Sequence, residues 1–244
     1  MHSNKPVRLS LESIVQISAG QFHSLALDSR GLVYSWGWGV HGQLGHGHFD
    51  DVQEPEVVHR LSKLVVVQVA AGYAHSLCLT KDGEIWSFGL GLYGQLGSGA
   101  TDKSLVPLRI VLDAPVRQVS TGYFHCLAIS EDGTVYQWGS HPQVLRLEAQ
   151  QRKKEMLMQK DQDQDQEASE SPVSLPTFIP PVSEQHLTPQ VFDTSGVRGR
   201  VNSISCGSQH SLVLTDLGQV TFFRNFLFPL SKILSPNKNY PQFC

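Results

Sequence analysis

A segment of 28 residues occurs twice in this chain, and this internal repeat limits what the chain can fold into more than any other feature. Residues 20–47 align without a gap to residues 72–99 and share 14 of 28 positions. A third copy starts at Gly122 and matches the first at 10 of 18 positions, and a fourth starts at Gly207 and matches at 7 of 17. Such a repeat predicts an array of similar structural units.

The same pattern continues upstream of each copy. Apolar residues lie six and three positions before the first glycine: Ile14 and Ile17, Val66 and Val69, Val116 and Val119, Val201 and Ile204. A proline lies 14 to 18 residues before each of these glycines: Pro6, Pro55, Pro107 and Pro189. The unit is therefore roughly 50 residues long, a period that is typical of propellers and arrays.

Within a unit, the pattern favours short β-strands. His23–Leu27 and Val33–Trp36 are β-rich runs, and the segment between them ends at Gly31, where a turn needs a positive φ. Asp82-Gly83 and Asp132-Gly133 mark the same hairpin in units two and three. Because no unit shows a long helical period, we expect an all-β fold of antiparallel blades that bury their faces against each other, with a β-solenoid as the competing architecture.

Several positions recur in register and are expected to be structural. They are Gly20, His23, Trp36 and Gly42 in unit one, Gly72, His75, Phe88 and Gly94 in unit two, Gly122, His125 and Trp138 in unit three, and Gly207 and His210 in unit four. The aromatic residue at the end of the second strand of each unit is the expected wedge between blades, and unit four has Phe223 there.

These residues resemble a known repeat. The string G-x-x-H-S-L-x-L…D-G-x-V-x-x-W-G…G-Q-L-G-x-G, taken over residues 20–47 and 72–99, is similar to the repeat of the regulator of chromosome condensation family. The resemblance covers residues 6–139 and 189–223, and it implies a β-propeller of four-stranded blades that has seven blades when complete. Four units suggest a fragment, a truncated product, a partial propeller completed by a partner, or a smaller closed ring.

An insertion divides the repeats. We expect repeats one to three at residues 1–139, a charged, low-complexity insertion at 140–188, and a fourth, partial repeat at 189–223. The composition of the insertion predicts disorder. A solvated loop is the simplest interpretation, and a partner-binding loop or one phosphorylated at Ser169 or Ser171 is the alternative.

A divergent tail follows the fourth repeat at residues 224–244. Unrelated apolar and proline-containing residues stand there in place of the expected glycine-rich loop. We interpret the tail as a truncated or alternatively spliced end that exposes Phe226, Leu227 and Phe228 beside an unfinished blade edge.

Charge, cysteine content and hydropathy narrow the functional classes. The 19 basic and 22 acidic side chains give a net charge of -3, which argues against specific nucleic-acid binding through a basic surface. The four cysteines form no C-x-x-C pair and are expected to be free thiols of a reducing compartment. No apolar stretch is long enough to span a membrane, and the N-terminal residues lack a signal-peptide pattern, so we expect a cytoplasmic or nuclear protein.

Two G-x-G-x-x-G strings occur, at residues 37–42 and 89–94. A dinucleotide site requires a following helix to hold the pyrophosphate, and Gln-Leu-Gly follows both strings instead. No Gly-Lys-Ser or Gly-Lys-Thr string occurs either. We therefore assign these glycines to blade loops and expect no cofactor.

One histidine recurs in each unit, at His23, His75, His125 and His210. Equivalent positions of successive blades lie around an axis and cannot converge on one metal ion, so we interpret these side chains as buried imidazoles that hydrogen-bond backbone groups. The residue after each histidine points to the opposite face of its strand, which argues against a Ser/His dyad or a Cys/His nucleophile. The loop histidines His41, His46 and His48, near Asp50 and Asp51, are a second metal candidate, for which a solvated loop is the simpler interpretation.

The loops that follow the second strands of units one and two match closely, but a few of their positions differ: Trp38 and Leu90, Val40 and Leu92, His41 and Tyr93. Exposed aromatic and apolar side chains are typical of binding surfaces. We predict a partner-binding rim made of Trp38, His41, Leu92 and Tyr93, with packing between blades as the alternative.

Blade construction explains every recognisable motif and leaves none for covalent chemistry. The sequence therefore predicts a non-enzymatic protein-protein interaction module, or scaffold, that binds a folded protein partner. The resemblance implies an alternative, a guanine nucleotide exchange factor for a Ras-like small GTPase. Such a factor needs no catalytic nucleophile, because it acts by binding the nucleotide-free GTPase more tightly.

Overall fold

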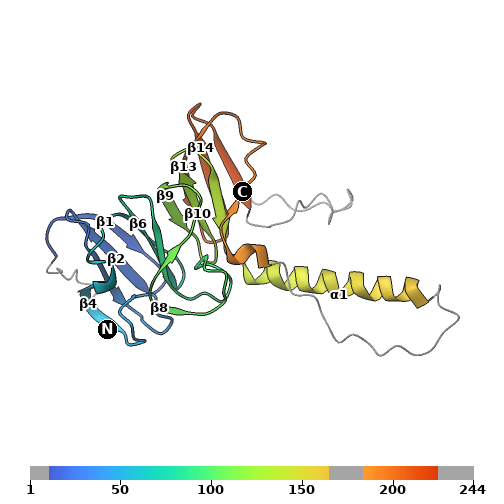
Figure 1. Cartoon of the computed structure of the whole chain (residues 1–244), viewed down its shortest axis with the longest axis horizontal. Coiled ribbons are helices and arrows are strands. Elements are labelled where there is room, and N and C mark those ends of the chain that lie inside the picture. Colours follow the sequence, from blue (N-terminus) through green and yellow to red (C-terminus); the bar gives the residue numbers. More distant parts are fainter. Residues whose placement is uncertain (1–10, 165–183, 225–244) are drawn as a thin grey trace, which may run out of the picture.

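Four antiparallel sheets make up most of the protein. The computed structural model describes residues 11–164 and 184–224, and in each sheet the strands pair in sequence order (Figure 1). The first sheet contains β1 (Ile14–Ala19), β2 (His23–Asp28), β3 (Val33–Gly37) and β4 (Val52–Val57). The second contains β5 (Val66–Ala71), β6 (His75–Thr80), β7 (Ile85–Gly89) and β8 (Ser104–Ile110).

The third and fourth sheets follow the same order. The third contains β9 (Val116–Thr121), β10 (Cys126–Ser130), β11 (Val135–Trp138) and β12 (Gln190–Val191). The fourth contains β13 (Val201–Cys206), β14 (His210–Thr215) and β15 (Val220–Arg224), so it has three strands within the described residues. The four sheets are successive blades of a propeller, which we call blades one to four, and the prediction of an all-β blade array is confirmed.

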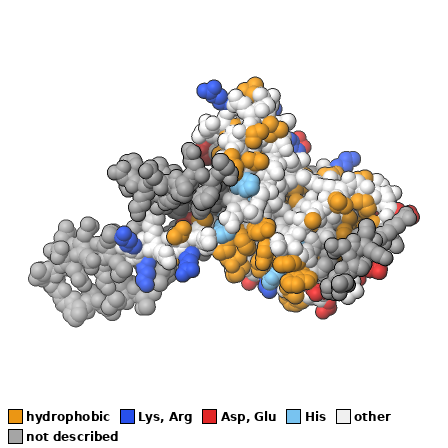
Figure 2. All heavy atoms as spheres, turned by 180° about the vertical axis from the view of Figure 1, so that it is seen from behind, with side chains coloured by type: hydrophobic (Ala, Val, Ile, Leu, Met, Phe, Trp, Pro, Cys, Tyr) orange, Lys and Arg blue, Asp and Glu red, His pale blue; other side chains and the backbone are white. Residues whose placement is uncertain are grey.

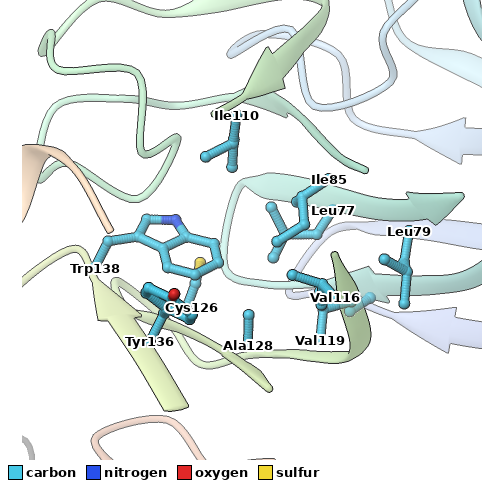
Figure 3. Packing of buried hydrophobic residues seen from close by; sticks show 11 residues of the cluster. Leu77, Leu79, Ile85, Ile110, Val116, Val119, Cys126, Ala128, Tyr136 and Trp138 are labelled. Atoms are coloured by element: carbon cyan, nitrogen blue, oxygen red, sulfur yellow. The ribbon is translucent and has the colours of Figure 1, made fainter. Parts of the chain in front are cut away.

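The hydrophobic core is divided into three clusters, each lying between two consecutive blades. The cluster between blades one and two contains Leu25 and Leu27 on one side and Val69 and Phe88 on the other. Figure 3 shows the next cluster, in which Leu77, Leu79 and Ile85 of blade two face Val116, Val119 and Trp138 of blade three. The third joins Leu127 and Ile129 of blade three to Ile204 and Val213 of blade four. The aromatic wedges therefore pack between blades at Phe88 and Trp138 as expected.

Glycine is required at the hairpin between the second and third strands of each blade. Gly31, Gly83 and Gly133 have φ values of 88°, 79° and 91°, a region that side chains with a Cβ rarely adopt. Gly83 also lies against Pro115 at the start of the next blade, where an added Cβ would lie 2.6 Å from the proline Cβ. The predicted turns are therefore confirmed, and in blade two the turn glycine also allows close packing between blades.

The insertion is partly helical, which corrects the expectation of disorder across residues 140–188. Pro142–Gln164 form helix α1, which projects away from the sheets (Figure 1), and Glu184–Leu187 form the short 3-10 helix η2. Good helix formers dominate α1, and its first turns are fixed because Val144 and Glu148 are buried. No described helix is long and apolar enough to cross a membrane.

The insertion also lies within a blade. Tyr136 and Gln137 of β11 pair with Val191 and Gln190 of β12, so residues 190–191 complete blade three, and blade four begins only at Val201. The predicted boundary at residue 189 was therefore too early for the fourth unit. The tail beyond Arg224, including Phe226, Leu227 and Phe228, and the candidate phosphorylation sites Ser169 and Ser171 lie outside the described residues.

A glutamine on the innermost strand of each of the first three blades binds the next blade. The Gln68 amide nitrogen donates to the Val119 carbonyl, and the Val119 N–H donates to the Gln68 amide oxygen, both at 2.9 Å. The same pair of bonds joins Gln16 to Val69 and Gln118 to Ile204. Each amide thus satisfies backbone groups on the unpaired edge of the neighbouring inner strand, where no further strand is available.

We expect Gln68→Ala to lower the free energy of unfolding by about 1 to 3 kcal/mol, because it leaves the Val119 N–H and carbonyl without these partners. Urea denaturation followed by circular dichroism measures the change. Gln53→Ala, at an exposed position on β4, is the matched control and should change stability by less than about 0.5 kcal/mol. Equal effects of the two substitutions would contradict a structural role for the amide pair.

Candidate functional site

Two kinds of loop meet at one end of the blades. The turns between the first and second strands occupy residues 20–22, 72–74 and 122–125, and the longer loops after the third strands begin at Trp38 and Leu90. Trp38 N donates to the Phe22 carbonyl at 2.9 Å, and Leu90 N donates to the Ala74 carbonyl at 2.8 Å. These backbone hydrogen bonds join the two kinds of loop into one surface.

Aromatic rings form a continuous row across this surface. Trp38 stacks on Phe22 with ring centroids 4.4 Å apart, and Phe22 lies 6.1 Å from Tyr73. Tyr73 contacts Phe124 at 5.4 Å, and Phe124 meets Tyr93 edge to face at 5.0 Å. These contacts place rings of blades one, two and three side by side, at the separations that favour aromatic pairs.

A sixth ring, Tyr123, links blade three to blade one. Its ring lies 5.4 Å from Tyr73, and its hydroxyl donates to the Gln21 side-chain oxygen at 2.9 Å. We call the six residues Phe22, Trp38, Tyr73, Tyr93, Tyr123 and Phe124 the aromatic band. The band crosses three blades and is fixed to the backbone of two kinds of loop.

The band is accessible to a partner. Trp38 is 49% exposed although it stacks on Phe22, and Phe22, Tyr123 and the adjoining Leu92 are exposed as well. At its other end Phe124 lies 5.4 Å from His141, one residue before α1, and Figure 2 shows hydrophobic side chains gathered beside the root of this helix. An exposed apolar surface of this kind is typical of an interaction site.

The structure brings together two of the four residues predicted to bind a partner. Trp38 and Tyr93 belong to the aromatic band, where Phe22, Tyr73 and Phe124 connect them. Leu92 and His41 lie in the same loops, but among the described residues neither makes a ring contact with the band. Leu92 is exposed, and His41 is partly buried, with its pKa lowered by burial and by the charge of Lys103.

Sequence reasoning missed four residues of the band: Phe22, Tyr73, Tyr123 and Phe124. All four occupy the two positions between the first glycine and the histidine of a repeat. Because these positions vary between the copies, they carried no signal in the repeat alignment. The sequence does contain one indication of these residues, because an aromatic residue occurs at one or both of these positions in each of the first three units.

The glycines of the G-x-G-x-x-G strings build inter-blade loops. Gly42 has a φ of 82°, and its Cα faces the Ser104 carbonyl of blade two. Gly94 has a φ of 78° and faces the His186 carbonyl in η2. In both places a Cβ would meet backbone atoms of the neighbouring element, which explains the glycine without any phosphate ligand.

The recurring histidines connect each blade to the next through side chains. His23 Nε2 lies 2.9 Å from Ser76 Oγ, and the two further pairs are His75 Nε2 with Cys126 Sγ at 3.2 Å and His125 Nε2 with Ser211 Oγ at 3.2 Å. The expectation of hydrogen bonds to backbone groups is therefore corrected for the Nε2 atoms, whereas His125 also has a backbone hydrogen bond with His210. A serine or cysteine does pair with a histidine, but the two come from different blades.

The direction of the hydrogen bonds shows that these histidines do not act as bases toward their partners. The Ser76 hydroxyl donates to the Gln43 carbonyl at 2.8 Å, so His23 Nε2–H must donate to Ser76 Oγ. Likewise, the Cys126 thiol donates to the Gln95 carbonyl at 3.4 Å. The histidine therefore takes no proton from the serine or the thiol, as a catalytic base would.

Burial keeps these groups neutral. Desolvation lowers the pKa of His23 and His125 to about 4 and that of His75 to about 3, and it raises the pKa of the Cys126 thiol well above its usual range. A thiol in this state is a poor nucleophile.

The loop histidines of blade one engage separate partners. His46 Nε2 lies 2.9 Å from Ser35 Oγ, and His48 Nδ1 lies 3.4 Å from an Asp50 carboxylate oxygen. Across residues 11–164 and 184–224, no three His, Cys, Asp or Glu side chains are grouped so that they could hold a metal ion.

Comparison with known repeats identifies the architecture. One model of the regulator of chromosome condensation (RCC1) repeat matches residues 30–79 and 82–129, and a second model of this repeat matches residues 14–43 and 66–95. Over residues 14–129 the chain belongs to the RCC1 repeat family. The resemblance seen in the repeated strings is therefore confirmed.

Two curated proteins are similar to parts of this chain. The chain is 41% identical over 109 residues to the ultraviolet-B receptor UVR8 of Arabidopsis thaliana. This match covers 43% of this chain and 25% of that protein. It is 32% identical over 226 residues to the X-linked retinitis pigmentosa GTPase regulator homolog of Caenorhabditis elegans, covering 84% of this chain and 15% of that protein. The chain thus spans a quarter or less of the length of these two relatives.

A solved structure supports the propeller. Prp20p of Saccharomyces cerevisiae, whose crystal structure was described with its binding properties to Gsp1p and histones, superimposes with a TM-score of 0.63 at 24% identity. The match covers 89% of this chain and 47% of that one. At this identity the likeness establishes the fold and leaves the function of these RCC1 repeats to be argued from their surface.

We expect stability to fall between pH 7 and pH 5. Unfolded histidines take up protons near pH 6.5, whereas the folded His23, His75 and His125 remain neutral until about pH 4 or below. Acidification therefore favours the unfolded chain, by about 1.4 kcal/mol per pH unit below 6.5 for each histidine. Urea denaturation at pH 7, 6 and 5 measures this slope.

His75→Gln should reduce that slope by about one proton. Gln53→Ala, at an exposed position on β4, removes no titratable group and should leave the slope unchanged. A free energy of unfolding that stays constant from pH 7 to pH 5 would show that these imidazoles are not held neutral by burial.

Proposed function

We propose that this chain is a protein-interaction module whose aromatic band binds a folded protein partner. The observation that carries the proposal is the row of six contacting rings across three blades, of which Phe22, Trp38 and Tyr123 are exposed. Tyrosine and tryptophan are enriched among the residues that contribute most to binding energy in protein interfaces. The band also lies at the loop end of a rigid scaffold, where binding residues are usually found.

The contacts within the band support binding at low entropic cost. Trp38 is held by stacking on Phe22, and Tyr123 is held by its hydrogen bond to Gln21. Side chains that are already ordered lose less conformational freedom when a partner arrives. The rings form a broad surface, which suits a folded protein better than a small molecule that needs an enclosing pocket.

The relatives favour a small GTPase as the first partner class to test. Prp20p is described with its binding to Gsp1p, and the Caenorhabditis elegans relative is named a homolog of a GTPase regulator. Because the chain matches only part of each of these proteins, the partner class is carried over as part of the proposal.

Substitution of exposed rings should weaken partner binding. We expect Trp38→Ala and Tyr123→Ala each to reduce the affinity about tenfold or more, because each removes an exposed ring of the aromatic band. Cross-linking with the wild-type chain as bait identifies the partner by mass spectrometry, and calorimetry with the purified partner measures the affinity. Val111→Ala, an exposed position away from these loops, is the control.

Separate His41→Ala and Leu92→Ala variants test the two predicted residues that lack ring contacts with the band. We expect smaller losses from them than from Trp38→Ala. Wild-type affinity in both ring variants would move the interface away from the aromatic band.

Guanine nucleotide exchange is the second candidate, supported by the same GTPase-related relatives. An exchange factor must bind the nucleotide-free GTPase more tightly than the nucleotide-bound form. If the chain is only an interaction module, we expect fluorescent GDP to leave each member of a Ras-like GTPase panel at its intrinsic rate. Acceleration for any member, lost in Trp38→Ala, would establish exchange activity at the aromatic band.

A further inference from the structure

Each blade has two packing faces, and the three internal interfaces use them in the same way. We call the face toward the next blade the leading face and the face toward the preceding blade the trailing face. In blade one the leading face carries Leu25, Leu27 and Val33, which are buried against Val69 and Phe88 on the trailing face of blade two. The equivalent positions form the two other inter-blade clusters.

Among residues 11–164 and 184–224, no blade packs against the trailing face of blade one. Ile17 is 76% exposed, whereas its counterparts Val69, Val119 and Ile204 are 2%, 1% and 4% exposed because each packs against the preceding blade. Trp36, the counterpart of the fully buried Phe88, is also only partly buried. Thus blade one presents the same kind of apolar face that blades two to four bury.

The described residues of the leading face of blade four are exposed as well. Val220 is 64% exposed, whereas its counterparts Val33, Ile85 and Val135 are 1%, 1% and 2% exposed. Leu214 is also exposed, although the equivalent Leu27, Leu79 and Ile129 are buried. No blade within residues 11–164 and 184–224 packs against this face.

Phe222 makes the leading face of blade four more apolar than its equivalents. Blades one and two have Ser35 and Ser87 at this position, and each hydroxyl donates to a carbonyl of its own blade loop, at Leu44 and Leu96. The loop leucines are buried beside these serines. Blade four places an exposed phenyl ring there instead, which fits an apolar surface.

Each internal interface also contains a hydrogen bond between a histidine of one blade and a serine or cysteine of the next. The two open faces carry one member each of a further pair of this kind. Within the chain, His23, His75 and His125 each bind the residue that follows the histidine of the next blade. His210 of blade four and Ser24 of blade one are the remaining members of this series. The two faces therefore carry complementary halves of an interface that the chain already forms three times.

We propose that the leading face of blade four binds the trailing face of blade one in a second copy of the chain, head to tail. Val220, Leu214 and Phe222 of one copy pack on Ile17 and Trp36 of the other, and His210 meets Ser24 there. This contact continues the established blade-to-blade interface between molecules. Two copies joined at both ends close a ring, and a contact at one end only extends the array.

One component of the internal interfaces is missing at this contact. Ser203 occupies the position of Gln16, Gln68 and Gln118, and a serine is too short to form the amide pair with the next inner strand. We therefore expect reversible, concentration-dependent association rather than a permanent dimer.

The test uses the full chain in analytical ultracentrifugation over concentrations from about 1 to 100 μM. We expect the wild type to associate, and Ile17→Asp and Phe222→Asp each to weaken association about tenfold or more, because a carboxylate is placed in an apolar contact. Both residues are exposed, so the folded chain tolerates the change, which circular dichroism melting verifies. Val111→Asp, 81% exposed elsewhere, and Trp38→Ala are controls that should associate like the wild type.

Mixing the two variants tests the head-to-tail arrangement. Ile17→Asp retains a functional leading face and Phe222→Asp a functional trailing face, so an equimolar mixture should form a heterodimer although neither variant associates alone. An interface between two identical faces would instead be lost in one variant and intact in the other. A wild-type chain that stays monomeric at about 100 μM, or a mixture without the heterodimer, would overturn the proposal.

Discussion

The packing of one blade against the next is the constraint on which this fold depends. A blade of short antiparallel strands has two faces and no core of its own, so it becomes stable only when neighbours cover it. The repeated residues serve this need. Leu25, Leu77 and Leu127 fill the space between blades, and Gln68 binds the unpaired edge of the next inner strand. Even His75, which could have been taken for a catalytic or metal-binding group, is fully buried and bound to the next blade.

Because the repeated positions are occupied by packing, recognition falls to the positions that vary. Phe22, Tyr73 and Tyr123 stand between the glycine and the histidine of their units, where the blade interface imposes little restriction on the side chain. The repeat brings these positions to the same end of successive blades. Rings from sequence-distant units therefore touch, and a surface that is irregular in sequence becomes continuous in space.

Blade four shows how the array adapts when a repeat element is lost. Helix α1 begins where unit three would have its glycine-rich loop, so blade four lacks the loop contacts that Gly42 provides between blades one and two. Arginine side chains form hydrogen bonds between blades three and four instead. Arg117 donates to the Asn202 and Val201 carbonyls at 2.9 and 3.0 Å, and Arg200 donates to the Asp132 carbonyl at 3.1 Å. Long, charged side chains thus bridge a boundary that the short loop bridges elsewhere.

The sequence by itself determined the blade array, the hairpin glycines and the aromatic wedges, because each follows from a local pattern repeated in register. It also placed Trp38 and Tyr93 in a candidate surface. Tertiary structure alone decided which groups meet across blades: that His23 binds Ser76, 53 residues away, that Tyr123 reaches Gln21, and that β12 completes blade three from beyond the insertion. These contacts depend on the rotation and spacing of one blade relative to the next, which no local pattern encodes.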